Sequence, residues 1–342
     1  MHIKHISYNL RFKYPFTISR ATKTHQPTLI VSLEHFGVTG YGEAPAITYY
    51  HIPVEKMIAD LEIKKPVIEK FAFTEPSRFW HFLHHLIPDN PFLVCALDMA
   101  AWDLYGKLSK KPLYACWKLN ISEGPLTDYT IGIDTIDKMV EKMEARPWPI
   151  YKIKLGTGED ADIIRALRKH TKAVLRVDAN AGWNLQQALN LIPVLHENNV
   201  EFIEQPLAVE DVAGMKILFN ESAIPLIADE SCVKEQDVEK CHGLFHGVNI
   251  KLTKCSGLTP ALRMIETARK LGMKVMAGSM NESTIGSAAI GHLLPLLDYV
   301  DMDGILLLDE DIATGLNIEN GKVILSGEAG LGIRYTGLPL ES

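Results

Sequence analysis

The sequence YKIKLG, residues Tyr151–Gly156, is a short apolar segment with two lysines placed two positions apart. Because side chains alternate along a β-strand, Lys152 and Lys154 are expected on the same face, near the end of the strand. Two neighbouring ammonium groups depress each other's pKa, which suits a lysine that acts as a base near neutral pH. An isolated KxK also fits a solvent-facing edge strand, so the interpretation depends on the segments around it.

Strand-like segments of the same kind recur at a regular spacing through the second part of the chain. After Pro125, short apolar strands alternate with helical stretches about every 25 residues, which is the repeat of a (β/α) barrel. An open doubly wound sheet is the alternative, but no GxGxxG follows a first strand, and the near-even repeats favour closure. The predicted strands are YTIGI (129–133), IYKIKLG (150–156), AVLRVDAN (173–180), VEFIEQP (200–206), PLIADES (225–231), GVNIKL (247–252), KVMAGSM (274–280) and YVDMDG (299–304).

One connecting helix of this predicted barrel has clear end signals. Thr259 is a suitable N-cap, Pro260 occupies the first helical position, and Gly272 follows the last turn. The helix between them is therefore expected to join the strand at residues 247–252 to the strand at residues 274–280.

Residues 1–124 have a different pattern, typical of a small α+β unit. Strands are expected at residues 6–12, 28–36 and 38–45, and the segment Thr17–Pro27 is interpreted as a mobile loop. A buried helix follows, because apolar residues recur at helical spacing at Leu93, Ala96, Leu97, Ala100 and Leu104. We predict an N-terminal unit over 1–124, a barrel over 125–314, and a Gly-rich segment over 315–342 that returns to the N-terminal unit.

Composition limits the classes of function. The chain has 342 residues and a formal charge of −7 with no basic run, which argues against nucleic-acid binding. Its five cysteines are scattered without a CxxC pair, as expected for reduced thiols in the cytoplasm. The N-terminus has no apolar core of signal-peptide length and no stretch reaches the length of a membrane span, so no membrane partner is expected.

Polar residues at the strand ends predict a metal site. Asp178, Glu204 and Asp229 end three successive predicted strands, and the C-terminal ends of barrel strands surround one site. Three carboxylates brought together repel one another unless a hard cation lies among them, and oxygen ligands suit Mg²⁺, with Mn²⁺ as a substitute. The alternative, that each carboxylate is a helix cap or a solvated loop residue, does not explain three matching positions in successive repeats.

Two lysines are predicted on either side of these carboxylates. Lys154 precedes the metal-bearing strands and Lys251 follows them, so their amines would lie on opposite sides of a bound substrate. Such a pair can remove a proton from one face of a carbon and return it to either face. If the proton is next to a substrate carboxylate, Mg²⁺ stabilises the enolate that forms, a scheme known for enolase-superfamily sites.

The ordered motifs KIKLG, RVDAN, IEQP, ADES, NIKL, GSMNES and VDMDG resemble the enolase superfamily, muconate-lactonising subgroup. The resemblance runs from YGEAP (41–45) to GLGI (330–333) and is greatest to dipeptide epimerases of the L-Ala-D/L-Glu type. It implies a (β/α)7β TIM-like barrel with an α+β capping domain built from the N-terminal region and the C-terminal tail. Barrels of this kind often self-associate, so a homo-oligomer is expected.

The resemblance also implies roles for individual residues. Lys154 and Lys251 would be the acid/base pair in a two-base 1,1-proton transfer, and Asp178, Glu204 and Asp229 would bind Mg²⁺. Substrate contacts would come from Lys152, which would also lower the pKa of Lys154, and from Thr130 and Met280. Asp301 and Asp303, on one face of the last strand, would hold the amino group of a dipeptide by charge-assisted hydrogen bonds.

Specificity for the side chain of the epimerised residue should come from Thr17–Pro27 and from Tyr49–His51. Members that act on Ala-Glu carry an arginine in that loop; the matching position here is Ala21, with Arg20 one residue earlier. Either Arg20 still reaches the substrate or the enzyme accepts an uncharged residue. A cycloisomerase or an o-succinylbenzoate synthase is the alternative within the subgroup, although neither has an amine for Asp301 and Asp303 to bind. A non-catalytic relative would have lost a lysine or a metal ligand, and all are present.

Overall fold

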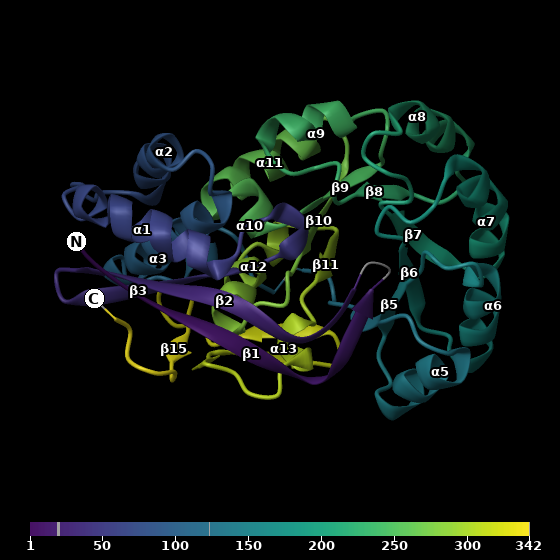
Figure 1. The fold of residues 1–342 in the computed structure, drawn as a ribbon, viewed down its shortest axis with the longest axis horizontal. Helices are drawn as coiled ribbons and strands as arrows, with labels where there is room; N and C mark the ends of the chain where they lie inside the picture. The colour runs from purple at the N-terminus through teal and green to yellow at the C-terminus, as the bar shows by residue number, and fades with distance from the viewer. Residues whose placement is uncertain (19–20, 123, 342) are drawn as a thin grey trace.

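The computed structural model describes residues 1–18, 21–122 and 124–341, and its main feature is an eight-stranded parallel sheet that curves into a barrel (Figure 1). Every predicted barrel strand is present, and the strand order follows the sequence. The strands are β4 (Tyr129–Ile131), β5 (Ile150–Lys154), β6 (Val174–Asp178), β7 (Val200–Glu204), β8 (Leu226–Ala228), β9 (Gly247–Ile250), β10 (Lys274–Gly278) and β11 (Tyr299–Asp301). The prediction of a closed barrel rather than an open sheet is confirmed.

The barrel closes at a seam between its first and last strands. β4 and β11 form no ladder, but Thr127 pairs with Val300 in an isolated parallel bridge. The Thr127 hydroxyl also accepts a 2.7 Å hydrogen bond from the Met302 N–H, and the Asp303 carboxylate accepts one of 2.6 Å from the Thr130 N–H. Side chains therefore replace part of a strand ladder here, and they fix the chain that carries Asp301 and Asp303.

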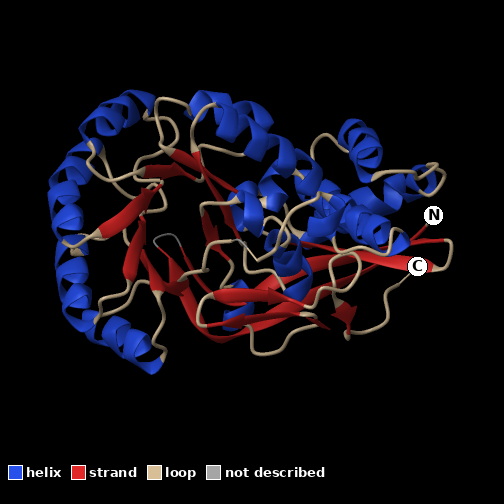
Figure 2. Ribbon diagram, turned by 180° about the vertical axis from the view of Figure 1, so that it is seen from behind, coloured by secondary structure: helices blue, strands red, loops and turns tan. Residues whose placement is uncertain are grey.

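Helices surround the strands, as expected for alternating β and α units (Figure 2). They are α5 (Ile136–Ala145), α6 (Asp160–His170), α7 (Leu185–Glu197), α8 (Val212–Glu221), α9 (Glu235–Cys241), α10 (Leu252–Cys255), α11 (Leu258–Lys270), α12 (Thr284–Gly291), the short η2 (Leu294–Leu296) and α13 (Gly304–Leu307). The large hydrophobic core lies mainly between these helices and the barrel strands.

The prediction that Thr259 caps α11 is wrong. The helix begins at Leu258, and Gly257 is its N-cap. Asp98 of the capping domain takes over the role of the cap, because its carboxylate accepts hydrogen bonds from the Thr259 N–H (2.9 Å) and hydroxyl (2.7 Å). Burial raises the pKa of Asp98 to about 7 despite these hydrogen bonds. The sequence signal at the end of the helix is correct, since Gly272 follows the last turn with a φ of +70°.

The capping domain consists of an antiparallel sheet packed against helices, on the left of Figure 1. Its elements are β1 (His2–Ile18), β2 (Ala21–His35), β3 (Val38–Pro45), the short η1 (Thr48–Tyr50), α1 (Val54–Ile68), α2 (Pro76–Leu86), α3 (Pro91–Leu108) and α4 (Leu113–Cys116). The predicted apolar stripe lies on α3, where Leu93, Ala96, Leu97, Ala100 and Leu104 are all fully buried.

The interpretation of Thr17–Pro27 as a mobile loop is wrong for the described residues. β1 and β2 extend beyond the sheet as a two-stranded hairpin, in which Thr17 pairs with Thr22 and Ile18 with Ala21. The sequence of the hairpin lacks the alternation of apolar and polar residues that would predict strands, because the hairpin projects over the barrel instead of covering a hydrophobic core. Residues 22–28 still contain several threonines, whose β-branched side chains favour strands.

The C-terminal segment returns to the capping domain, as predicted. Its strands are β12 (Ala313–Thr314), β13 (Leu316–Glu319), β14 (Lys322–Leu325) and β15 (Arg334–Tyr335). Tyr335 stacks on Tyr41 and shares a 2.7 Å hydrogen bond with Tyr8, and His5 pairs with Glu341. The fold class predicted from the sequence is confirmed, while the boundaries at 124/125 and 314/315 stay predictions.

Two further properties concern the described part of the chain. No helix there is both long and apolar enough to cross a membrane. All five cysteines are free thiols, and four of them are buried.

Candidate active site

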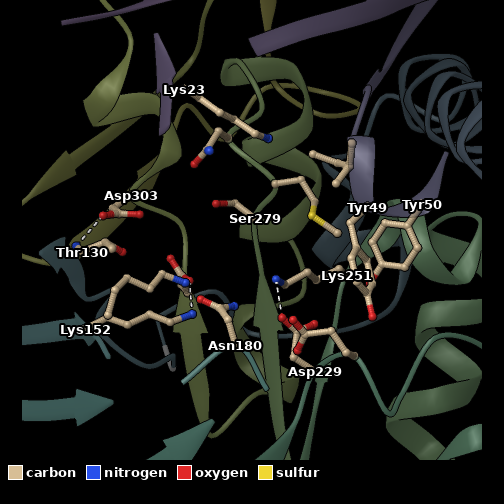
Figure 3. A pocket seen from close by; sticks show the side chains of 16 residues that line it. Lys23, Tyr49, Tyr50, Thr130, Lys152, Asn180, Asp229, Lys251, Ser279 and Asp303 are labelled. Atoms are coloured by element: carbon tan, nitrogen blue, oxygen red, sulfur yellow. Dashed lines mark hydrogen bonds and ion pairs between the residues drawn. The ribbon is translucent and has the colours of Figure 1, made fainter. Parts of the chain in front are cut away.

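A pocket lies at the C-terminal ends of the barrel strands, where the capping domain covers them (Figure 3). Most of the predicted site residues line it, including Lys152, Lys154, Asp229 and Lys251. Thr130, Met280, Asp301 and Asp303 line the same pocket. Residues from six different strands or strand ends thus converge, as parallel barrel topology requires.

Lys152 occupies the centre of a buried network of carboxylates. Its Nζ lies 2.7 Å from Glu204, 2.8 Å from Asp301 and 3.2 Å from Asp178, and its side chain is 1% exposed. Burial lowers the pKa of Lys152, but the charges of Asp301 and Glu204 outweigh it, and the pKa is raised well above its usual value. The sequence-based expectation considered only the repulsion between neighbouring lysines and omitted these carboxylates.

The two predicted acid/base lysines contact different carboxylates. Lys154 Nζ lies 2.6 Å from Asp178 Oδ2, and Lys251 Nζ lies 2.7 Å from Asp229 Oδ2. Lys154 ends β5 and Lys251 directly follows β9, so the three strands β6, β7 and β8 lie between them. The structure therefore places the two amines on opposite sides of the strands that carry the three predicted metal ligands, as the sequence predicts.

The three predicted metal ligands form a row of buried acids. Asp178 and Glu204 are register partners on β6 and β7, and Asp229 directly follows β8. Burial and the nearby charge of Asp178 raise the pKa of Glu204, the result expected when carboxylates are crowded together.

The donor chemistry of this row fits a hard divalent cation, because all three side chains offer carboxylate oxygens from successive strands. Asn249 also lies here, and its amide donates a 2.8 Å hydrogen bond to Glu204 Oε1. In the described part of the chain, no three Asp, Glu, His or Cys side chains form a metal-binding cluster by themselves. Each of the three carboxylates instead contacts a lysine ammonium group.

The pKa values of Asp301 and Asp303 are shifted in opposite directions. β11 stops at Asp301, and Asp303 is the N-cap residue of α13, so strand alternation alone does not place the pair. Lys152 outweighs burial and lowers the pKa of Asp301 to about 2. Burial and the neighbouring Asp301 raise the pKa of Asp303 to about 7. Both still line the pocket, where Thr130 fixes Asp303 through its N–H.

The capping domain contributes a cation that the sequence analysis missed. Lys23 of β2 reaches into the pocket from the side opposite Lys152 and Asp229 (Figure 3). Partial burial and the charge of Lys251 lower the pKa of Lys23. Lys23 pairs with Phe16 in the β1–β2 hairpin, and this pairing fixes its position at the pocket. The sequence analysis missed Lys23 because it interpreted the segment as a loop, for which no strand register can be predicted.

The predicted specificity residues are only partly placed by the structure. Tyr49 and Tyr50 lie beside Lys251 in Figure 3. Both tyrosines line the pocket, and Ile47 is a further lining residue. Arg20 lies outside the described residues, and Ala21 begins β2. The pocket therefore has an aromatic side and a lysine at its rim.

This fold and site define a class of enzymes in which barrel strand ends hold acid/base groups and carboxylates, and a separate domain closes over them. Residues 2–116 match the family model described as the N-terminal domain of mandelate racemase and muconate lactonizing enzyme. Residues 134–337 match the model described as enolase C-terminal domain-like. The chain belongs to the mandelate racemase/muconate lactonizing enzyme family of the enolase superfamily.

Known relatives cover nearly the whole chain. The chain is 52% identical to the L-Ala-D/L-amino acid epimerase of Flavobacterium johnsoniae, over 95% of this chain and 97% of that protein. It is 53% identical to the protein of the same name from Maribacter sp., over 97% and 99%.

Solved structures of epimerases are also similar to nearly the whole chain. The L-Ala-D/L-Glu epimerase from Bacillus subtilis, in a substrate-liganded complex, is 25% identical with a TM-score of 0.93, and 99% of each chain is covered. A dipeptide epimerase from Cytophaga hutchinsonii, complexed with Mg and D-Ala-L-Val, is 27% identical with a TM-score of 0.89, covering 98% of this chain and 96% of that one. These relatives are epimerases, that is, isomerases that invert a stereocentre.

Proposed function

We propose that this protein is a Mg²⁺-dependent dipeptide epimerase that inverts the α-carbon of the C-terminal residue. The observation that carries the proposal is that Lys154 and Lys251 line one pocket and come from strands on either side of those that carry the three buried carboxylates. A base on each side of the α-carbon allows deprotonation of either epimer and reprotonation from the other side, so both directions of the reaction use the same two residues.

Asp178, Glu204 and Asp229 are the residues that would hold the cation. Bound there, Mg²⁺ supplies positive charge that stabilises the negative charge developing on the substrate carboxylate during proton removal. Mn²⁺ prefers the same oxygen ligands and is expected to substitute for it. The support is the donor set itself and the Mg in the complex of the Cytophaga hutchinsonii enzyme.

The substrate's two charged ends are proposed to bind neighbouring groups on one side of the pocket, where Lys152 lies 2.8 Å from Asp301 and Asp303 accepts a hydrogen bond from the Thr130 N–H. The ionised Asp301 attracts the dipeptide's ammonium group, and Asp303 lies beside it. Lys152 remains cationic because three carboxylates surround it, and its positive charge can attract the substrate carboxylate towards Thr130. Met280 lines the same pocket.

The side chain of the epimerised residue is proposed to lie near Lys23, Tyr49 and Tyr50. The two tyrosines offer apolar surface to uncharged side chains, while Lys23 favours an acidic one at the rim. Two relatives at 52% and 53% identity are named for D/L-amino acids rather than for glutamate alone. We therefore propose a range of L-Ala-containing dipeptides, acidic and uncharged, instead of Ala-Glu only. Cytoplasmic location and self-association remain predictions.

A mass-spectrometric screen of L,L-dipeptides in D₂O with Mg²⁺ tests this function. Uptake of one deuterium at the α-carbon, together with formation of the L,D isomer, is the expected result. If no dipeptide exchanges its α-proton while muconate or a succinylbenzoate precursor turns over, the cycloisomerase or o-succinylbenzoate synthase alternative replaces the proposal.

A further inference from the structure

Asp229, one of the three predicted metal ligands, is held by two buried side chains that have no assigned role, those of Lys254 and Gln205. We propose that Lys254 and Gln205 are positioning residues that fix Asp229 in one orientation, so that only its Oδ2 is presented to the pocket. This inference rests on the proposed role of Asp229 as a metal ligand. It concerns how the site is built, and it has a test that is independent of turnover.

Lys254 holds Asp229 by its side chain and by its backbone. The Lys254 ammonium group donates to Asp229 Oδ1 at 2.6 Å, to the Asp229 carbonyl at 2.5 Å and to the Asn249 carbonyl at 3.3 Å. Its side chain is completely buried. An ammonium group has three N–H donors, and all three are used here. Lys254 therefore has no donor left for a substrate, unlike Lys251, and serves as a fixed cation.

Gln205 holds the same residue from the neighbouring strand end. Its Oε1 accepts hydrogen bonds from the Asp229 N–H at 3.1 Å and from the Ser231 N–H at 3.0 Å. Its Nε2 donates to the Leu207 carbonyl and to the Ser231 hydroxyl, both at 2.9 Å. The amide is fully buried, and both of its donors and both acceptor positions are satisfied.

The backbone of Gln205 supports a specific role. Its φ is +35°, in the left-handed region that non-glycine residues rarely adopt. Such a conformation persists where the surrounding contacts determine it, and it is concentrated at functional sites. Here it turns the side chain from the end of β7, directly after Glu204, towards the loop that follows β8. The residue thus connects two of the predicted ligands.

Together, these contacts leave one atom of Asp229 available. The N–H is bound by Gln205, and the carbonyl and Oδ1 are bound by Lys254. Oδ2 is the remaining oxygen, and it lies 2.7 Å from Lys251 Nζ at the pocket. The Asp229 side chain would hold the cation and also contacts Lys251 through Oδ2. A change in its orientation would therefore displace the cation relative to Lys251.

A matched control is available outside the site. Lys107 of α3 also donates to one carbonyl and one carboxylate, those of Thr39 (2.9 Å) and Asp103 (2.7 Å), but within the capping domain. Lys107→Met therefore removes a partly buried lysine with similar bonding without touching the pocket. It separates a general loss of stability from a loss of orientation at Asp229.

The experiment compares Lys254→Met, Gln205→Met and Lys107→Met in the full-length protein. Isothermal titration calorimetry with Mg²⁺ alone gives the dissociation constant, and circular dichroism establishes that each variant is folded. We expect Mg²⁺ binding to weaken by about 10- to 100-fold in Lys254→Met and Gln205→Met, as for other residues that orient metal ligands. Lys107→Met should bind Mg²⁺ within about twofold of the wild type. If Lys254→Met does not fold, Gln205→Met decides the question.

Turnover gives a second readout. At saturating Mg²⁺ the two site variants should still show a reduced kcat, because the cation is bound but misplaced relative to Lys251. Folded Lys254→Met and Gln205→Met proteins with wild-type Mg²⁺ affinity would overturn the inference and leave the proposed function intact. A wild-type protein that neither binds Mg²⁺ nor exchanges the α-proton of any dipeptide would overturn both.

Discussion

His292 makes the structure sensitive to acid at a place away from the pocket. It follows α12, and its ring is 1% exposed and stacks on Tyr114 with the ring centroids 5.5 Å apart. Its Nδ1 accepts a hydrogen bond from the Tyr114 N–H at 3.3 Å. Burial lowers the pKa of His292 to about 4. The neutral form of the His292 ring accepts this hydrogen bond from α4, so it stabilises the contact between the barrel and the capping domain.

The size of the effect follows from the difference between the folded and unfolded states. An unfolded histidine has a pKa of about 6.5, so below that pH the unfolded chain binds a proton that folded His292 does not. Stability is complete above about pH 6.5 and is lost as the pH falls towards the folded pKa of about 4. From pH 7 to pH 4.5, His292 alone should remove about 2 kcal/mol from the free energy of unfolding.

Urea unfolding of the wild type and of His292→Gln at pH 7 and pH 4.5 measures this contribution. Glutamine keeps a polar side chain of similar length but does not titrate, so the variant should lose about 2 kcal/mol less than the wild type over this interval. His170→Gln, which replaces an exposed histidine on α6, is the control and should follow the wild type. Equal losses in the wild type and His292→Gln would refute the assignment of this acid sensitivity to His292.

Three further predictions concern the site. Lys154→Met and Lys251→Met should each slow epimerisation by at least about 10²-fold. Each variant should still exchange the α-proton of one epimer, and the epimer should differ between the two variants, which NMR in D₂O can measure. Exchange of both epimers by either variant would contradict the two-base scheme. EDTA should stop exchange and added Mg²⁺ should restore it, whereas full exchange in EDTA would exclude a metal requirement. Lys23→Met should lower kcat/KM for L-Ala-L-Glu by about tenfold relative to L-Ala-L-Leu. Lys13→Met, which removes an exposed lysine of β1 that does not line the pocket, is the control. An unchanged ratio in Lys23→Met would exclude Lys23 from a role in specificity.

The barrel and the convergence of the candidate site residues could be predicted because they depend on a regular repeat. Each unit ends a buried strand with a polar residue, and parallel strands bring these ends together whatever the intervening helices contain. The register of β5, β6 and β7 puts Lys154, Asp178 and Glu204 in adjacent positions, as alternation and the repeat predict.

The contacts between distant segments could not be predicted in the same way. The cap on α11 comes from Asp98 in another domain, so the local Thr259-Pro260 signal points to the wrong residue. Lys23 enters the pocket only because the hairpin extends over the barrel. Lys254 lies three residues after Lys251, and its spacing alone does not show that it points away from the pocket towards the Asp229 backbone.

The residues proposed for proton transfer and those proposed for substrate specificity differ in their burial and in their ion pairs. At the barrel end of the site, Lys152, Lys154 and Lys254 are each paired with buried carboxylates, and removal of one partner would leave an uncompensated buried charge. Substitution in this network is therefore costly. Lys23 and Tyr49 come from the capping domain and are partly exposed, so they can change without disturbing that network. We therefore expect substrate preference in this family to vary through the capping domain, while the proton transfer stays with the barrel.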